Sequence, residues 1–138
     1  MKTAWENKDI CKYIIDKNFP PLAYSDHFES LLKCVQQIEP EYKKLIDIGC
    51  CAAEFADAFP NFNYCGADLP HIIEQISKIQ NPNLDYMTFD ATADDFAFCR
   101  HFDVIVMNSF LSEMQDPLEI LDKVLNFSMK YVIIHRQD

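Results

Sequence analysis

The chain alternates short apolar runs with stretches of helical periodicity. The runs FDVIVMN (102–108) and KYVIIH (130–135) are almost continuously hydrophobic, rather than alternating with polar residues. Such runs are typical of strands that are covered on both faces, as in a parallel sheet with helices on either side. Together with shorter runs, they predict five β-strands, at 44–49, 63–67, 84–89, 102–108 and 130–135.

Three successive segments are predicted before the first of these strands. Residues 7–17 predict a leading helix, and the paired prolines within 18–26 predict an extended or turning stretch. Asp26 followed by Glu29 forms a capping box, which begins a helix whose apolar residues repeat at helical spacing as far as Ile38.

Three further helices are predicted between the strands. The first covers 51–59, and the second carries the isoleucines between 72 and 79. The third begins after Asp116, with Pro117 in the first helical position and Glu119 completing a capping box. The expected buried stripe of this third helix consists of Leu118, Leu121, Val124 and Leu125.

The order of these elements predicts an α/β fold, with a doubly wound parallel sheet of about five strands and helices on both faces. Right-handed crossovers make 3-2-1-4-5 the natural strand order. We expect a single domain over 1–138, with an N-terminal extension at 1–26 and a core at 27–138. The topological switch point then lies between the first and fourth strands, where ligands bind in open α/β sheets.

Composition narrows the choice of partners and compartment. The chain has 138 residues, of which 22 are acidic and 12 basic, and a formal net charge of −10. This charge disfavours binding to nucleic acid or to an anionic membrane surface. The chain shows neither an apolar run of membrane-spanning length nor the apolar core of a signal peptide near its start, so we expect a cytoplasmic protein.

The cysteines do not form a pattern that suggests chemistry. Six cysteines include no C-x-x-C pair, and none has a histidine nearby at zinc-ligand spacing. Several lie inside apolar runs, where a free cysteine behaves as a small hydrophobic residue. We therefore expect reduced structural thiols, with no disulfide and no metal site.

Acidic residues lie at or just after the ends of the first three predicted strands. Asp47 lies inside the end of the first strand, Asp68 follows the second and Asp90 follows the third. Asp68 comes 19 residues after Gly49, close to the spacing at which nucleotide-binding folds place a carboxylate for the ribose hydroxyls. These residues predict a site for an adenosine-containing ligand, whose identity the pattern leaves open.

Most of these polar residues also have an ordinary structural explanation. Asp68 is placed to cap the following helix, and Asp90 is placed to act as a turn acid. Asn108 is placed to satisfy backbone groups at a strand end, and a lone histidine such as His135 fits a structural role there. Asp47 is harder to explain in this way, because an unpaired buried carboxylate is costly.

The same segments resemble the motifs of class I S-adenosylmethionine-dependent methyltransferases. LIDIGCCAA (45–53) is similar to their first motif, an acidic residue, any residue and then Gly-x-Gly-x-Gly, and YCGADLP (64–70) is similar to the second. FDAT (89–92) resembles the segment after the third strand, and 102–125 resembles the fourth-strand block of small-molecule methyltransferases. With the final YVIIHR, the resemblance covers about residues 26–136 and rests on the order and spacing of the pieces.

This resemblance implies that the cofactor is S-adenosylmethionine. It assigns Asp47 and Gly49 to the methionine part and Asp68 to the ribose. It assigns Asp90 to adenine, and it places Asn108 and Ser109 beside the sulfonium. The implied cofactor contacts are Asp47, Gly49, Cys51, Asp68, Leu69, Asp90, Ala91 and Asn108.

The sequence departs from the family pattern in the first motif and in the fourth-strand block. Of the three glycines only Gly49 is present, and Cys51 and Ala53 occupy the other two positions. We expect the Cys51 side chain to crowd the methionine tail of the cofactor. Glu113 replaces the histidine that is usual in the fourth-strand block.

The chain also stops just after the fifth predicted strand, at Asp138. We therefore expect a Rossmann-like methyltransferase fold that lacks the family's last two strands. Strand 130–135 would then be an apolar edge that needs a cover, either segment 1–26 or the same edge of a second molecule. A homodimer with Tyr131 and Ile133 in the interface is the expected solution.

The leading functional hypothesis is S-adenosylmethionine-dependent methyl transfer to a small-molecule or sugar-derived acceptor. Alignment and desolvation supply much of the acceleration in such a reaction, so no residue is assigned a catalytic role. The alternative is a degenerate, non-catalytic module for binding or assembly. An NAD-linked oxidoreductase is disfavoured, because a single glycine leaves no pyrophosphate-binding G-x-G-x-x-G.

Overall fold

The computed structural model describes residues 26–108, 110–127 and 130–135. The helix expected at 7–17 and the stretch expected at 18–25 lie outside the described residues, and so does the side chain of Asp26 with its predicted capping box. No helix within these ranges has the length and apolar character needed to cross a bilayer.

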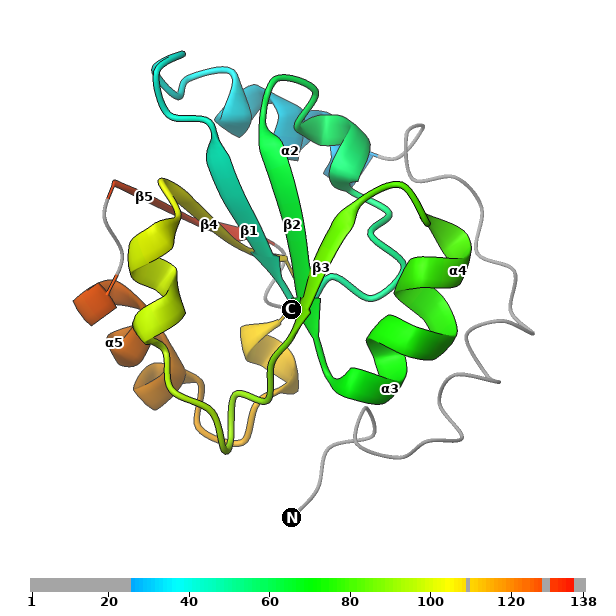
Figure 1. Cartoon of the computed structure of the whole chain (residues 1–138). Helices are drawn as coiled ribbons and strands as arrows, with labels where there is room; N and C mark the ends of the chain where they lie inside the picture. The colour runs from blue at the N-terminus through cyan, green and yellow to red at the C-terminus, as the bar shows by residue number, and fades with distance from the viewer. Residues whose placement is uncertain (1–25, 109, 128–129, 136–138) are drawn as a thin grey trace.

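Five parallel strands form one sheet in the order β3-β2-β1-β4-β5 (Figure 1). This order confirms the predicted doubly wound α/β fold and its switch point between the first and fourth strands. The strands are β1 (Lys44–Ile48), β2 (Asn63–Asp68), β3 (Asp85–Thr88), β4 (Val104–Asn108) and β5 (Tyr131–His135).

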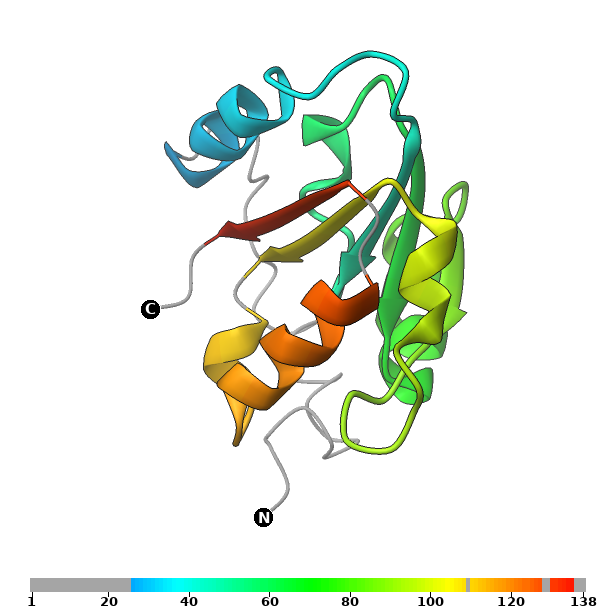
Figure 2. The ribbon, with the colours of Figure 1, turned by 90° about the vertical axis from the view of Figure 1, so that its left-hand side faces the viewer.

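Helices cover both faces of the sheet. In Figure 2, α2 (Asp26–Val35) and α5 (Pro117–Phe127) lie on opposite sides of β4 and β5. One hydrophobic cluster joins α2 to the β1–β2 connection, and its buried members include Leu31, Val35, Phe55 and Phe59. The other joins α5 and the 3-10 turn η5 (Ala97–His101) to the opposite face, and its buried members include Ile46, Ile48, Phe96, Ile105 and Val124.

The segment 51–59 differs from its prediction as a helix. It forms a series of turns that ends in a short 3-10 turn, η3 (Ala56–Ala58). The cause is local, because Cys51 and Ala53 have φ angles of 49° and 59°. Left-handed residues at these two positions prevent a right-handed helix from starting there.

The second inter-strand helix is present but contains an irregular turn. It begins as α3 (Pro70–Ile72), continues as a π-helical turn, η4 (Ile73–Ser77), and ends as α4 (Lys78–Gln80). Ile72, Ile73 and Ile76 are buried, whereas Ile79 is exposed. The inserted residue of a π-helical turn shifts the face that the following residues present.

Helix α5 begins where the sequence predicts, but it buries only part of the predicted stripe: Val124 is buried and Leu121 packs against the core. The backbone N–H of Glu119 donates to Asp116 Oδ1 at 3.3 Å, which confirms Asp116 as the cap, while the Glu119 carboxylate pairs with Lys123. The buried residues are Ile120 and Val124, and two members of the predicted stripe, Leu118 and Leu125, are 77% and 53% exposed. Two apolar stripes compete on this helix, so periodicity alone does not select the buried one.

Candidate functional site

The polar residues singled out in the sequence lie along the carboxyl edge of the sheet. Asp68 and Asn108 are the last residues of β2 and β4, and Asp47 is the last but one of β1. Gly49 follows β1 directly, next to the switch point between β1 and β4. The parallel register brings Asp47 opposite Gly66 on one side and Val106 on the other.

The loop 49–53, which follows β1, has an unusual backbone. Gly49, Cys51 and Ala53 have φ angles of 78°, 49° and 59°. These are the three positions that glycine occupies in the Gly-x-Gly-x-Gly motif, and only glycine adopts such angles without steric cost. The loop therefore keeps the positive φ angles expected of a glycine loop, although two of its three glycines are replaced.

Hydrogen bonds from β2 hold the start of this loop. The carbonyl of Ala67 accepts the N–H groups of both Gly49 and Cys50, at 2.8 and 3.1 Å. Asp68 Oδ2 accepts the N–H of Cys51 at 2.9 Å. The loop is thus fastened to the end of the neighbouring strand by its first three N–H groups.

Asp68 connects this loop to the start of α3. Besides Cys51 N–H, its carboxylate accepts the N–H of Leu69 at 2.7 Å through Oδ1. Because one carboxylate oxygen binds the loop and the other binds the start of the α3 segment, Asp68 braces the loop as well as holding the helix start. Each carboxylate oxygen has two lone pairs, which leaves acceptor capacity for a ligand hydroxyl. Burial raises the pKa of Asp68.

Asp47 is buried and has a partner that the sequence did not suggest. The Tyr64 hydroxyl donates to Asp47 Oδ2 at 2.5 Å, and both side chains are buried. Burial is the main cause that raises the pKa of Asp47 to about 7; the nearby charges of Glu54 and Asp68 act in the same direction, and the Tyr64 hydrogen bond opposes them. A carboxyl group with a pKa close to neutral pH therefore lies in β1, two residues before loop 49–53 begins.

Asp90 forms a turn of its own. Its Oδ1 accepts both the N–H and the hydroxyl of Thr92, at 2.9 and 2.7 Å, and its own N–H donates to Asp94 at 2.7 Å. Ala91 is 8% exposed and packs in the cluster with Phe89 and Phe96. The structure therefore gives Asp90 the turn role, and its predicted adenine contact stays a prediction.

Asn108 is bonded to the next strand. Its Oδ1 lies 2.8 Å from His135 Nδ1, and His135 Nε2 lies 2.8 Å from the Ser30 hydroxyl. An amide oxygen only accepts, so Nδ1 carries the proton and Nε2 accepts from Ser30. His135 thus joins β4, β5 and α2 in a structural role, and Ser109 lies outside the described residues.

The thiols have the character expected of packing residues. Cys34, Cys50, Cys65 and Cys99 form no disulfide within the described ranges, and burial raises the pKa of Cys65 to about 11 and that of Cys99 to about 12. Cys51 packs against Ile72 and Ile76. Within the described part of the chain, no group of three or more His, Cys, Asp or Glu is placed to hold a metal ion.

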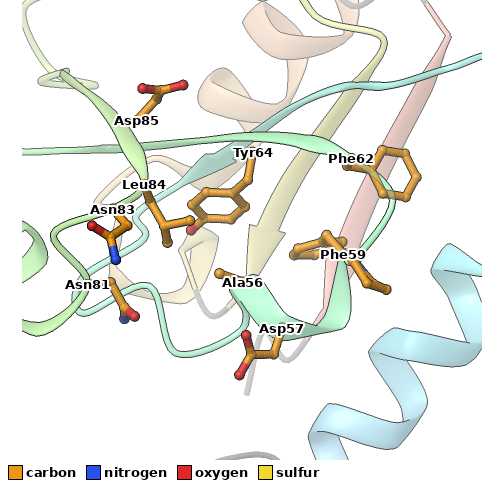
Figure 3. A pocket seen from close by; sticks show the side chains of 10 residues that line it. Ala56, Asp57, Phe59, Phe62, Tyr64, Asn81, Asn83, Leu84 and Asp85 are labelled. Carbon is orange, nitrogen blue, oxygen red and sulfur yellow. The ribbon is translucent and has the colours of Figure 1, made fainter.

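A cavity of about 380 Å³ opens at the other edge of the sheet, between the β1–β2 and β2–β3 connections (Figure 3). Its lining includes Phe59, Phe62, Tyr64, Asn83 and Asp85. Most of these residues lie near the amino ends of β2 and β3, so the cavity opens away from the carboxyl edge, although Tyr64 in its lining bonds to Asp47.

Sequence reasoning did not identify several residues that build the loop region. Tyr64, Ser77 and Asn81 all bond to the loop or to Asp47, and Glu54 adds to the buried charge. A polar residue inside an isoleucine stripe was a signal for Ser77. Tyr64 and Asn81 offered none, because their partners lie 17 and 29 residues away.

Comparison with known sequences gives a family for the chain. Residues 22–134 match a family described as "Methyltransferase domain". A curated relative, columbamine O-methyltransferase of Coptis japonica, is 27% identical over 143 residues, a match that covers 92% of this chain and 38% of the relative. The chain therefore spans well under half of that protein.

Solved structures share the fold. Human N-acetylserotonin methyltransferase in complex with SAM is similar with a TM-score of 0.67 and 13% identity, over 91% of this chain and 36% of that one. DesVI of Streptomyces venezuelae gives 0.64 and 15%, over 93% and 56%. CalS10 of Micromonospora echinaspora, an amino pentose methyltransferase with SAM bound, gives 0.61 and 12%, over 86% and 50%. By its sequence match over most of its length, the chain belongs to the methyltransferase domain family.

Proposed function

We propose that the chain binds S-adenosylmethionine at the carboxyl edge of β1, β2 and β4 and transfers its methyl group to a small-molecule or sugar-derived acceptor. The observation that carries this proposal is the left-handed backbone at residues 49, 51 and 53, fastened to the carboxylate of Asp68. Strained residues persist where the surrounding structure requires the conformation, and such positions concentrate at ligand sites.

The residues at this edge fit the groups of such a cofactor. Asp68 has free lone pairs for ribose hydroxyls, and loop 49–53 offers a close approach of backbone for the methionine part. The remaining proposed contacts lie at or just after the carboxyl ends of the first four strands, and they are Asp47, Leu69, Asp90, Ala91 and Asn108.

The chemistry asks for alignment more than for a protein base. The bound sulfonium supplies an activated methyl group, and the chain's residues orient it and exclude water. The names of similar proteins, columbamine O-methyltransferase and an amino pentose methyltransferase, support a small-molecule or sugar-derived acceptor with a hydroxyl or amine nucleophile.

Calorimetric titration with S-adenosylhomocysteine, S-adenosylmethionine and NAD tests the cofactor. We expect binding of the first two, and Asp68→Asn should weaken S-adenosylhomocysteine by about tenfold or more, because charge-assisted bonds to the ribose are lost. Asp85→Asn, at the exposed start of β3, is the matched control. An absence of binding at millimolar ligand contradicts the cofactor proposal, and an unchanged affinity in Asp68→Asn contradicts the role of Asp68.

A second candidate is a binding or assembly module without turnover. Cys51 and Ala53 in place of glycine, and Glu113 in place of the usual histidine, support it. Incubation with S-adenosylmethionine carrying a labelled methyl group, across a panel of phenols, amines and amino sugars, separates the two. Tight binding without label transfer to any acceptor favours the module.

We also propose a homodimer through the β5 edge. In the described sheet β5 pairs with β4 alone, and Ile134 is 44% exposed on it. Tyr131 and Ile133, expected in the interface, pack partly against the α2 cluster, so Ile134 is the better probe. Light scattering should give a dimer for the wild type and a monomer for Ile134→Lys, with Leu118→Lys on α5 as the control. A wild type that stays monomeric at high concentration refutes the dimer.

The thiols support a reducing compartment such as the cytoplasm, which we propose as the location. In the described part of the chain, Cys34, Cys50, Cys65 and Cys99 form no disulfide, and Cys50 and Cys99 are buried. Thiols of this kind persist where glutathione and thioredoxin keep them reduced. Fractionation of cells that express the full protein tests the location.

A further inference from the structure

Loop 49–53 needs support, because two of its left-handed residues carry a Cβ atom. Cys51 has a φ of 49° and Ala53 a φ of 59°. A non-glycine residue in this region is less stable than in its preferred conformations, and it stays there only when neighbouring contacts require it. The contacts that hold the carbonyl side of the loop identify what supplies this support.

Two side chains beyond α3 bind the carbonyls of this loop. The Ser77 hydroxyl donates to the carbonyl of Cys51, and Asn81 Nδ2 donates to the carbonyl of Ala52 at 2.7 Å. Ser77 is completely buried, so its bond is shielded from competing water. The two bonds grip consecutive peptide groups between the two left-handed side-chain-bearing residues, Cys51 and Ala53.

The π-helical turn places Ser77 and Asn81 in position. Ser77 is the last residue of the turn η4. Asn81 lies four residues after Ser77 and directly follows α4. Tyr86 of β3 braces both, since its hydroxyl shares its one proton between the carbonyls of Asn81, at 2.8 Å, and Ser77, at 3.2 Å. The sulfur of Cys50 lies 3.8 Å from the Ser77 hydroxyl oxygen. The pair is therefore fixed from the sheet side as well as from the loop side.

We propose that Ser77 and Asn81 are positioning residues that hold loop 49–53 in its cofactor-binding conformation, in place of the two missing glycines. The inference rests on the proposed function for the identity of the ligand. In this arrangement the conformation that glycine adopts freely is imposed on Cys51 and Ala53 by two bonds from one segment. Without those bonds, the loop relaxes toward negative φ and the cofactor surface is lost.

The test measures S-adenosylhomocysteine affinity in Ser77→Ala and Asn81→Ala by calorimetry. Each variant leaves a loop carbonyl without its donor, and we expect a loss of affinity of about tenfold. Asn83→Ala, two residues from Asn81 and exposed, is the matched control and should bind as the wild type does.

Restoring the glycines separates positioning from a merely structural role. In a Cys51→Gly/Ala53→Gly background the loop adopts positive φ without strain, so Ser77→Ala should lower the affinity by less than about threefold. Its loss of thermal stability should persist in that background, because the hydrogen bond is still removed. A merely structural role predicts the same loss of affinity in both backgrounds, and that result overturns the proposal.

A readout without cofactor keeps the two proposals distinct. One-bond Cα–Hα couplings of residues 51 and 53, measured by NMR, report the sign of φ in the unliganded protein. They should shift toward negative φ in Ser77→Ala and Asn81→Ala, and stay unchanged in Asn83→Ala. Failure of the wild type to bind S-adenosylhomocysteine contradicts the proposed function alone, whereas unchanged couplings in both variants overturn the positioning role.

Discussion

The chain has only two glycines, and each lies where a side chain would collide with a neighbour. A Cβ atom on Gly49 would lie 2.7 Å from Phe110 Cδ2, at a φ of 78° that disfavours side chains in any case. A Cβ atom on Gly66 would lie 2.7 Å from Cys50 Sγ and 2.8 Å from Tyr86 Cδ1. Gly49 thus lets the loop approach Phe110, and Gly66 lets β2 approach Cys50 of the loop and Tyr86 of β3.

These contacts predict that Gly49→Ala is the more harmful of the two alanine substitutions. It combines left-handed strain with a ring collision, and we expect it to lower the free energy of unfolding by about 2–4 kcal/mol. Gly66→Ala meets a sulfur atom and a ring without the strain, and should cost about 1–3 kcal/mol. Urea denaturation measures both. Gly49→Ala with wild-type stability would contradict the close approach of Phe110.

The buried carboxyl of Asp47 predicts a pH dependence of stability. Its pKa rises from an ordinary value of 3.8 to about 7 in the folded protein. Between these values the unfolded chain releases the proton while the folded protein keeps it, so folding stability falls as pH rises through this window. About three pKa units correspond to roughly 4 kcal/mol, lost in full above pH 7.

Asp47→Asn removes this cost and keeps an acceptor for Tyr64. Its stability relative to the wild type should therefore increase between about pH 4 and pH 7, by up to about 4 kcal/mol. Asp122→Asn, an exposed change of the same kind on α5, is the matched control. The measurement is urea denaturation at a series of pH values, and a constant difference for Asp47→Asn would show that Asp47 is ionised in the fold.

At the scale of elements, the strands were predictable because each is an apolar run near a polar residue that marks its end. The position of Asp68 at the end of β2 was also predictable, because its sequence distance from Gly49 corresponds to a fixed position on the neighbouring parallel strand. The conformation of loop 49–53 was not predictable from the sequence. Cys51 and Ala53 read as the start of a helix, and the bonds that override this preference come from Ser77 and Asn81, more than 25 residues away.

Helix α5 gives an element-scale prediction, because its buried face includes Val124 as expected but Ile120 in place of Leu118. Ile120 is 7% exposed and Leu118 is 77% exposed. Ile120→Ala should lower the free energy of unfolding by about 2–4 kcal/mol through a cavity, whereas Leu118→Ala should change it by less than about 0.5 kcal/mol. Chemical denaturation of the two variants measures this, and equal losses would restore the predicted stripe.

At the scale of the whole molecule, the carboxyl ends and the amino ends of the strands form two sides of the sheet with different features, the carboxyl edge and the amino edge. The carboxyl edge carries the strained loop, Asp68 and Asn108, while the amino edge carries the cavity lined by Phe59, Phe62 and Asp85 (Figure 3). The presence of a cavity, taken alone, would favour a ligand site at the amino edge. Backbone strain and buried carboxyl groups favour a ligand site at the carboxyl edge, where the switch point of the strand order lies.

The two edges predict different responses to S-adenosylhomocysteine. Amide NMR signals of residues 49–53 and of Leu69 should shift on titration, because the proposed cofactor site borders their peptide groups. Signals of Phe62, Asn83 and Asp85 should stay in place, since the β-strands separate them from the loop. Asn81 contacts both regions, through the cavity and through the carbonyl of Ala52, and is not a reporter for either. Shifts that centre on Phe62 and Asp85 would move the binding site to the amino edge, and the left-handed loop would then need an explanation other than a cofactor.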